Sequence, residues 1–306
     1  DPVTGKRGSI LDAARKAGAL PKIFFTTTST EYWTRAASLL HTDVDGKEDV
    51  VLAPETRLYL FSGAQHGNWA FEDRWPYAYC TNGFDHRFGM RALMSAMQRW
   101  LEEGIAPPDS VYPTFADGTL GTVEAYRERF PSLLDFRLPI ANLKPPRLEL
   151  GPRFATDGIV DRQPAGLGDR FVTTVPLPDE DGIDLGGIRL PGIAAPLATH
   201  TGWNLRRPEI GAEDQLARWS GSMLPFAVDE RDRQSAGDPR PSLEARYGSR
   251  EGYAEAVERA SSVLVGQGFL LEEDVPDVKA AALRRFDNVS THVPGDLSCA
   301  YSLPGH

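Results

Sequence analysis

Two strand-like runs decide how this chain can fold: PKIFFTTTSTE at residues 21–31 and RLYLFSGAQHG at residues 57–67. Each run is rich in the β-branched, aromatic and aliphatic residues that are typical of buried strands. Each then ends near a polar side chain, which is Glu31 in the first run and His66 in the second. In open α/β sheets, ligands bind in a crevice at the carboxyl ends of the strands. We therefore expect Glu31 and His66 to face one crevice.

A histidine beside a carboxylate is the pair from which many hydrolases build a general base. In that role His66 takes a proton from a nucleophile and returns it to the leaving group, while Glu31 accepts the imidazole N–H and fixes its tautomer. The alternatives are a partly exposed strand-end histidine and a carboxylate at the positive end of a helix dipole. Asp43, Asp45 and Asp49 lie between the two runs and are alternative acids.

An unusually aromatic stretch follows the histidine directly. We predict that Trp69, Phe71 and Trp75 wall an apolar substrate pocket, with Tyr77 and Tyr79 continuing the run. A plain packing role is the alternative, because aromatic side chains each bury about 150–250 Å² and anchor irregular loops well.

Four segments carry a resemblance to a known family: TEYW at residues 30–33, QHG at 65–67, WLEEGIAPP at 100–108 and PLATHTGWNLR at 196–206. Over most of its length the chain resembles a poorly characterised family of bacterial α/β-hydrolase-domain proteins. The resemblance implies a serine-type hydrolase, esterase-like, with Glu31 and His66 as the acid and histidine of a catalytic triad. For the 196–206 segment we predict a structural hydrogen-bond network, with substrate contact by Asn204 or Arg206 as the alternative.

The nucleophile of such a triad is not visible in the sequence. In α/β-hydrolases it comes first in the chain, on a G-x-S-x-G elbow. Ser62 and Ser222 are the nearest candidates, and both lack the two glycines of that motif. We therefore expect the chain to be the C-terminal part of a longer hydrolase, inactive by itself. Its partners would be an upstream segment of the same gene product, which carries the nucleophile, and a small-molecule ester substrate.

The expected fold class is α/β. Residues 1–115 are predicted to form the C-terminal part of an α/β-hydrolase-like sheet with its last helix, and residues 116–306 an appended mixed α+β segment. The pattern predicts helices over residues 9–18, 31–40 and 87–103, a β-hairpin within 171–190, and helices starting at 242–245 and covering 254–265 and 275–286.

Composition and spacing argue against several classes of function. A net charge of −10 without a basic stripe disfavours nucleic acid. No apolar run reaches the roughly 20 residues that span a bilayer. The histidines and cysteines show no metal-ligand spacing, and no nucleotide-binding motif occurs, so neither metal nor other cofactor is expected. Cys80 and Cys299 are expected to be buried free thiols rather than a disulfide.

A second hypothesis comes from another class of protein. The chain would be a non-catalytic binding or structural domain derived from a hydrolase, in which Glu31 and His66 remain as packing residues and the aromatic run binds a ligand or partner.

Overall fold

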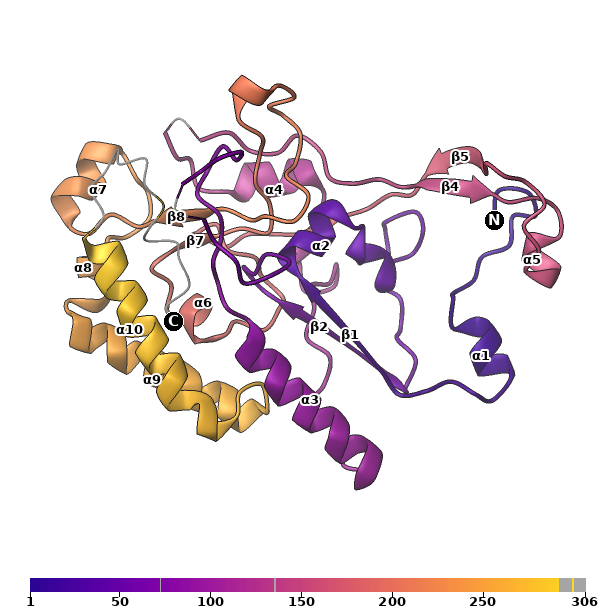
Figure 1. Ribbon diagram of the computed structural model, residues 1–306, viewed down its shortest axis with the longest axis horizontal. Coiled ribbons are helices and arrows are strands. Elements are labelled where there is room, and N and C mark those ends of the chain that lie inside the picture. Colours follow the sequence, from indigo (N-terminus) through magenta and orange to yellow (C-terminus); the bar gives the residue numbers. More distant parts are fainter. Residues whose placement is uncertain (72, 135, 292–298, 300–306) are drawn as a thin grey trace.

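The computed structural model describes residues 1–71, 73–134, 136–291 and 299 (Figure 1). Its helices are α1 (Asp12–Lys16), α2 (Ser29–Thr34), α3 (Arg87–Glu102), α4 (Val123–Arg129), α5 (Phe154–Asp157), α6 (Pro191–Ala194), α7 (Glu230–Ala236), α8 (Leu243–Tyr247), α9 (Arg250–Gln267) and α10 (Val275–Ser290). Its strands are β1 (Ile23–Thr28), β2 (Thr56–Phe61), β3 (Leu120–Gly121), β4 (Pro146–Glu149), β5 (Gly166–Arg170), β6 (Val175–Pro176), β7 (Ala198–His200) and β8 (Met223–Pro225). Short 3-10 helices cover Ala37–Leu40, Pro208–Ile210 and Glu272–Asp274.

Strands β1 and β2 form a parallel pair, which is the element that positions the site (Figure 1). Their register aligns Thr28 with Phe61, so the carboxyl ends of both strands lie at the same edge, as the sequence predicts. On the other side of β2, Val111 and Ile188 each donate a backbone N–H to a β2 carbonyl, over 3.0 and 2.7 Å. Backbone therefore covers both sides of β2, and its end is held firmly.

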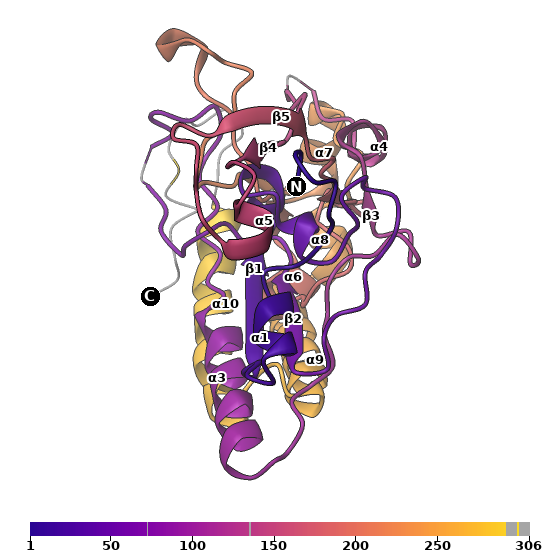
Figure 2. The same ribbon diagram turned by 90° about the vertical axis from the view of Figure 1, so that its right-hand side faces the viewer.

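The long helices α3, α9 and α10 flank this pair (Figures 1 and 2). One hydrophobic cluster joins Phe61 of β2 to Leu93 of α3, Leu264 of α9 and Val278 of α10. Burying apolar side chains from all four elements stabilises them together, at about 25 cal/mol for each Å² removed from water. Residues on both sides of the predicted boundary at 115 thus share one core, and the two-segment division stays a prediction.

A second cluster buries one face of α2, the short helix that carries Glu31. Trp33 of α2 and Trp203 are fully buried, with ring centroids 6.1 Å apart. The indole N–H of Trp203 donates to the Tyr126 hydroxyl over 2.9 Å, so the polar atom of this large side chain is satisfied. The cluster fixes α2 against α4, β6 and the segment that follows β7.

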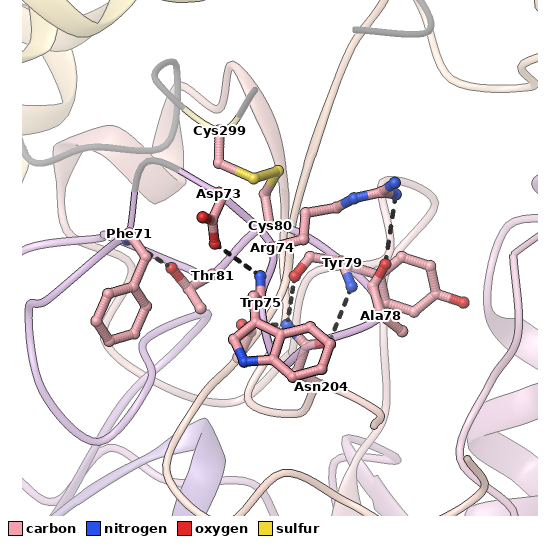
Figure 3. Close-up of a disulfide and its surroundings, with 11 residues drawn as sticks. Phe71, Asp73, Arg74, Trp75, Ala78, Tyr79, Cys80, Thr81, Asn204 and Cys299 are labelled. Atoms are coloured by element: carbon pink, nitrogen blue, oxygen red, sulfur yellow. Dashed lines mark hydrogen bonds between the residues drawn. A yellow bond between two sulfur atoms is a disulfide. The ribbon is translucent and has the colours of Figure 1, made fainter. Parts of the chain in front are cut away.

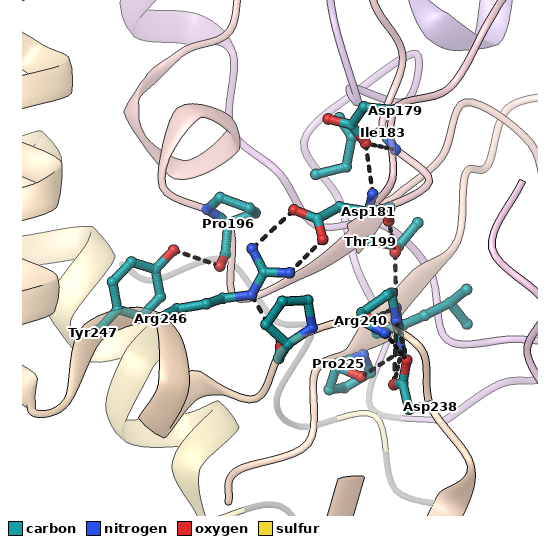
Figure 4. Close-up of polar contacts among 12 residues, drawn as sticks. Asp179, Asp181, Ile183, Pro196, Thr199, Pro225, Asp238, Arg240, Arg246 and Tyr247 are labelled. Atoms are coloured by element: carbon teal, nitrogen blue, oxygen red, sulfur yellow. Dashed lines mark hydrogen bonds and ion pairs between the residues drawn. The ribbon is translucent and has the colours of Figure 1, made fainter. Parts of the chain in front are cut away.

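The 196–206 segment forms the hydrogen-bond network predicted for it. The fully buried Asn204 side chain donates to the Tyr79 carbonyl over 3.0 Å and accepts from the Tyr79 N–H over 3.2 Å. Thr199 accepts a hydrogen bond from Arg240, which also pairs with Asp238, and both members of that ion pair are buried (Figure 4). A buried pair is tolerated when further hydrogen bonds satisfy its charges, as Thr199 does here.

Three helix predictions need correction. The predicted helix over 31–40 is α2 followed by a separate 3-10 turn, because Ala36 between them has φ of 58°, a left-handed conformation that no right-handed helix continues through. The helix predicted over 254–265 runs through Gly266 and ends at the positive-φ Gly268 instead. The helix predicted over 9–18 is reduced to the five residues of α1. The helices predicted over 87–103 and 275–286 closely match α3 and α10.

The hairpin predicted within residues 171–190 is confirmed only at its turn, where Pro178 and Asp184 form an antiparallel bridge around Gly182. The flanking runs do not pair with each other. β6 pairs antiparallel with β3, and Ile188 bridges to the end of β2. These partners are distant in sequence, so the local alternation of polar and apolar residues did not distinguish them from a hairpin. A hairpin does occur earlier, between β4 and β5, in an arm that extends away from the body of the fold (Figure 1).

The expectation of free thiols is also wrong. Cys80 and Cys299 form a disulfide, with Cα atoms 5.5 Å apart, and it joins the loop after Tyr79 to the segment after α10 (Figure 3). The residues lie 219 positions apart, so nothing in the local sequence of either indicates the pairing. Within the described residues, no helix is long and apolar enough to cross a membrane.

We predict that the unfolded, unreduced chain will show no reaction with a thiol reagent, because both of its cysteines are in this bridge. After reduction the same assay should detect both thiols. Titration with Ellman's reagent in denaturant, before and after reduction, measures this. Equal thiol signals in the two samples would mean that the bridge does not form.

Candidate active site

The ends of β1 and β2 bring Glu31 and His66 together. α2 follows β1 directly, and Glu31 occupies its first turn in a capping box with Thr28. One Glu31 carboxylate oxygen, Oε2, accepts the Thr28 backbone N–H over 2.7 Å and also the Thr28 hydroxyl. A capping box satisfies backbone donors that a helix start leaves unpaired. The cap therefore orients the carboxylate and leaves its second oxygen free to act elsewhere.

That second oxygen is hydrogen-bonded to the histidine. Glu31 Oε1 lies 2.6 Å from His66 Nδ1, within the reach expected for a triad acid and base. The Glu31 side chain is 18% exposed and that of His66 is 45% exposed, so the acid is sheltered while the base is open to solvent. Glu31 thus serves as both helix cap and histidine partner, two roles that the sequence presented as alternatives.

The other ring nitrogen of His66 remains available. Within the part of the chain that the structure describes, no group hydrogen-bonds His66 Nε2. The imidazole lies between two indoles, with ring centroids 6.1 Å from Trp69 and 4.4 Å from Trp219. Arg35 lies over the Trp219 ring at 4.0 Å. Because Nδ1 is hydrogen-bonded to the Glu31 carboxylate and Nε2 has no partner among the described residues, His66 can accept a proton from a nucleophile at Nε2.

The backbone between β2 and His66 is tightly fixed. The N–H of Gly63 donates to the fully buried Ser29 hydroxyl over 2.9 Å, and the Gly63 carbonyl accepts from the Asn82 amide over 2.6 Å. Gly63 has φ of 67°, and a Cβ there would come within 2.9 Å of Ile193, so glycine is needed at this turn. The Gln65 side chain accepts from Gly221 N–H over 2.9 Å. These contacts preorganise the position of His66.

The predicted aromatic wall is only partly gathered at the pair. Trp69 contacts His66, whereas the recorded ring contact of Phe71 is stacking with Tyr77 at 6.1 Å. Trp75 is 55% exposed and lies under Arg207 at 5.6 Å. Figure 3 draws Phe71 and Trp75 in the surroundings of the Cys80–Cys299 disulfide. Their role as substrate-binding residues stays a prediction.

Sequence reasoning missed Trp219 and Arg35. Trp219 reaches His66 only because the chain returns to this edge through β7 and the loop before β8. No periodicity or motif around residue 219 indicates such a contact, although a partly exposed tryptophan is a common component of binding surfaces.

The alternative acids are engaged elsewhere. Asp43 accepts the backbone N–H groups of Lys47 and Glu48, and these bonds hold the pKa of its carboxyl below the ordinary value. Asp45 pairs with Arg7, and Asp49 accepts two backbone N–H groups of the loop at 115–116. Each is a turn or loop residue, so Glu31 is the acid that the structure pairs with His66.

A buried carboxyl lies beneath the site. Asp184 is fully buried next to the Ser29 hydroxyl. Burial raises the pKa of Asp184 to about 7, against the smaller opposite effects of Ser29 and the Arg189 charge. Because Ser29 also holds Gly63, the ionisation of Asp184 is linked to the packing of the strand ends.

Replacing the carboxylate tests the orientation of the imidazole. With the Nδ1 proton donated to Glu31, the neutral His66 ring carries no proton on Nε2. In Glu31→Gln the amide oxygen can keep the helix cap and present its NH₂ to Nδ1, so we expect the ring proton to move to Nε2. Long-range ¹H–¹⁵N spectra in alkaline buffer distinguish the two tautomers.

Thr28→Ala is the matched control, because it removes the hydroxyl from the cap but leaves the carboxylate on His66. It should keep the parent tautomer while lowering stability by about 1 kcal/mol, as the loss of a capping side chain does. The same tautomer in Glu31→Gln as in the parent would show that Glu31 does not set it.

Comparison with known proteins gives one result at the level of family. A family model for an alpha/beta hydrolase domain matches residues 6–280, and that stretch includes Glu31, His66 and Trp219. No curated protein and no solved structure matches the chain.

Proposed function

The chain belongs to the alpha/beta hydrolase domain family, and on that premise we propose that it carries the acid and the histidine of a serine-type hydrolase acting on carboxylic esters. The single observation that carries this proposal is the 2.6 Å hydrogen bond between Glu31 Oε1 and His66 Nδ1 at the carboxyl ends of two parallel strands. His66 is 45% exposed and uses one ring nitrogen, which leaves the other accessible to a substrate group.

In the proposed reaction His66 Nε2 takes the proton of an attacking hydroxyl and later donates it to the leaving alcohol oxygen. Glu31 holds the imidazole in the tautomer that makes Nε2 the acceptor, and its charge stabilises the imidazolium that forms. Thr28 keeps Glu31 in place through the helix cap. The bonds to Gly63 keep His66 in place during both proton transfers.

The nucleophile and the oxyanion hole are proposed to come from an upstream segment of the same gene product. This chain would then be the C-terminal part of the catalytic unit, with the sheet in residues 1–115 and the appended segment in 116–306. The proposal follows from chain order in α/β-hydrolases, in which the nucleophile precedes the acid and the histidine. No G-x-S-x-G sequence occurs in the chain.

The substrate side of the pair is proposed to be apolar. Trp69 and Trp219 flank the histidine, and both are partly exposed, at 36% and 43%. Indole faces at a site open to solvent favour an aromatic or acyl group over a strongly hydrated one. Phe71 and Trp75 would extend this surface if a substrate reaches the loop that precedes Cys80.

The proposal is tested with the natural gene product and with the chain 1–306, each incubated with p-nitrophenyl esters and a fluorophosphonate label. We expect turnover and labelling of the gene product at a serine before residue 1 of this chain, and neither for the chain by itself. Labelling of a serine within 1–306 would refute the upstream nucleophile. Absence of both labelling and turnover in the gene product would favour the non-catalytic binding domain.

A further inference from the structure

A cavity of about 290 Å³ lies away from His66, where α6, the start of α3 and α10 meet (Figure 1). Its walls are largely apolar and include Phe84, Phe88, Leu190 and Val278. The volume is close to the lower end of small-molecule sites, which span roughly 300–1,000 Å³. A compact apolar molecule therefore fits the space.

One polar side chain of this wall is almost completely buried. His200 is 1% exposed and lines the cavity. Its Nδ1 lies 2.8 Å from the Asn82 side-chain oxygen. Within the described part of the chain no group hydrogen-bonds its other nitrogen, Nε2. Because His200 lines the cavity, a ligand hydroxyl can supply the missing partner of Nε2, and one such hydrogen bond contributes about 0.5–1.5 kcal/mol.

The protonation of His200 follows from the neighbouring amide. The Asn82 NH₂ group donates to the carbonyls of Gly63 and Thr201, over 2.6 and 3.1 Å, so its oxygen faces His200 as an acceptor. His200 must therefore donate its Nδ1 proton to Asn82. Burial lowers the pKa of His200 well below its ordinary value, and the Arg285 charge lowers it further. The ring is neutral, and Nε2 is a hydrogen-bond acceptor.

The cavity lining carries charges of both signs: the guanidinium groups of Arg87, Arg284 and Arg285 and the carboxylates of Asp85 and Asp277. Arg87 forms a two-pronged pair with Asp85, with nitrogen–oxygen distances of 2.9 and 2.7 Å. Arg285 donates to the Gly83 carbonyl over 2.7 Å. An anion would face the carboxylates of Asp85 and Asp277 and the lone pair of His200, and a cation would face the arginines. A neutral molecule avoids the repulsion between like charges in both cases.

We propose that this cavity binds a neutral, apolar small molecule bearing one hydroxyl group, such as an alkyl-substituted phenol, whose hydroxyl donates to His200 Nε2. The inference does not depend on the proposed hydrolase function, because it rests on a different cavity and is tested by binding. The occupant would contact His200, which is hydrogen-bonded to Asn82, the residue that holds the Gly63 carbonyl near the end of β2.

Calorimetric titration with thymol tests the proposal, with thymol methyl ether and para-isopropylbenzoate as comparisons of similar size. The ether lacks the hydroxyl donor and the benzoate is an anion. We expect thymol to bind roughly tenfold more tightly than either, which is the effect of one buried hydrogen bond left unmade. Equal or tighter binding of the ether or the benzoate would overturn the proposed chemistry, and no binding of thymol would overturn the site.

Variants locate the binding. His200→Phe removes the acceptor and should erase the preference of thymol over its ether. Ala281→Phe places a ring on the α10 face that lines the cavity and should abolish thymol binding without touching the polar network. Asn288→Phe puts the same ring at an exposed position of α10 outside the lining and should bind as the parent does. Parent-like binding by a folded Ala281→Phe variant would place the ligand elsewhere.

Discussion

Asp184→Asn should make the protein more stable than the parent at neutral pH and remove part of its pH dependence. The expected gain in the free energy of unfolding is on the order of 4 kcal/mol above pH 7, and it should vanish below pH 4. Asparagine keeps the shape of the side chain and removes the cost of ionising a fully buried carboxyl.

The direction follows from the pKa of Asp184 in the two states. Burial raises the pKa of Asp184 to about 7 in the folded protein, from 3.8 as the ordinary value. Below about 3.8 the carboxyl is protonated in both states and its stabilising contribution is fully present. As the pH rises the unfolded chain releases the proton first, so the contribution falls and is lost once the pH passes about 7.

Urea unfolding of the parent and the variant at several pH values between 4 and 8 measures the effect. Burial lowers the pKa of His41 to about 4, and that shift changes stability in the opposite direction over the same range. Subtracting the free energy of unfolding of the parent from that of the variant at each pH cancels the contribution of His41. Asp169→Asn, at an exposed position, should give a difference that does not vary with pH. An equally flat difference for Asp184→Asn would show that Asp184 ionises normally.

The elements and the pair predicted correctly depend on local patterns. Strands β1 and β2 are short runs rich in β-branched, aromatic and aliphatic residues, and helices α3 and α10 have apolar residues at helical spacing. Glu31 and His66 follow from them, because each lies just beyond a strand and the strands are parallel. Two neighbouring strand ends are sufficient to predict one hydrogen bond.

The features that could not be predicted depend on contacts between distant residues. Trp219 approaches His66, and Cys299 bonds Cys80, because separate parts of the chain fold back to the same place. The same holds for the pairing of β6 with β3. A single sequence records local preference, whereas loop closure and packing decide which distant segments meet. The helix prediction across Ala36 failed for a different reason, because the left-handed conformation of this residue contradicts the preference of alanine for helix.

His66→Ala should lower p-nitrophenyl ester turnover by the natural gene product at least roughly a hundredfold, the lower end of what a general base contributes. The melting temperature should change little, because the side chain is 45% exposed and Glu31 keeps its bonds to Thr28 without it. Steady-state kinetics and thermal unfolding of the same preparations measure both quantities. Parent-like turnover would exclude His66 as the base.

Added imidazole separates a catalytic loss from a structural one. The cavity left at the exposed position can admit free imidazole, which Glu31 can orient through the oxygen that His66 vacates. Turnover by His66→Ala should therefore rise with imidazole concentration, whereas the parent should respond weakly. Glu31→Ala together with His66→Ala should lose most of this rescue, because the acceptor that orients the ring is then absent. A variant that unfolds at lower temperature and shows no rescue would identify His66 as a packing residue, and the hydrolase proposal would lose its base.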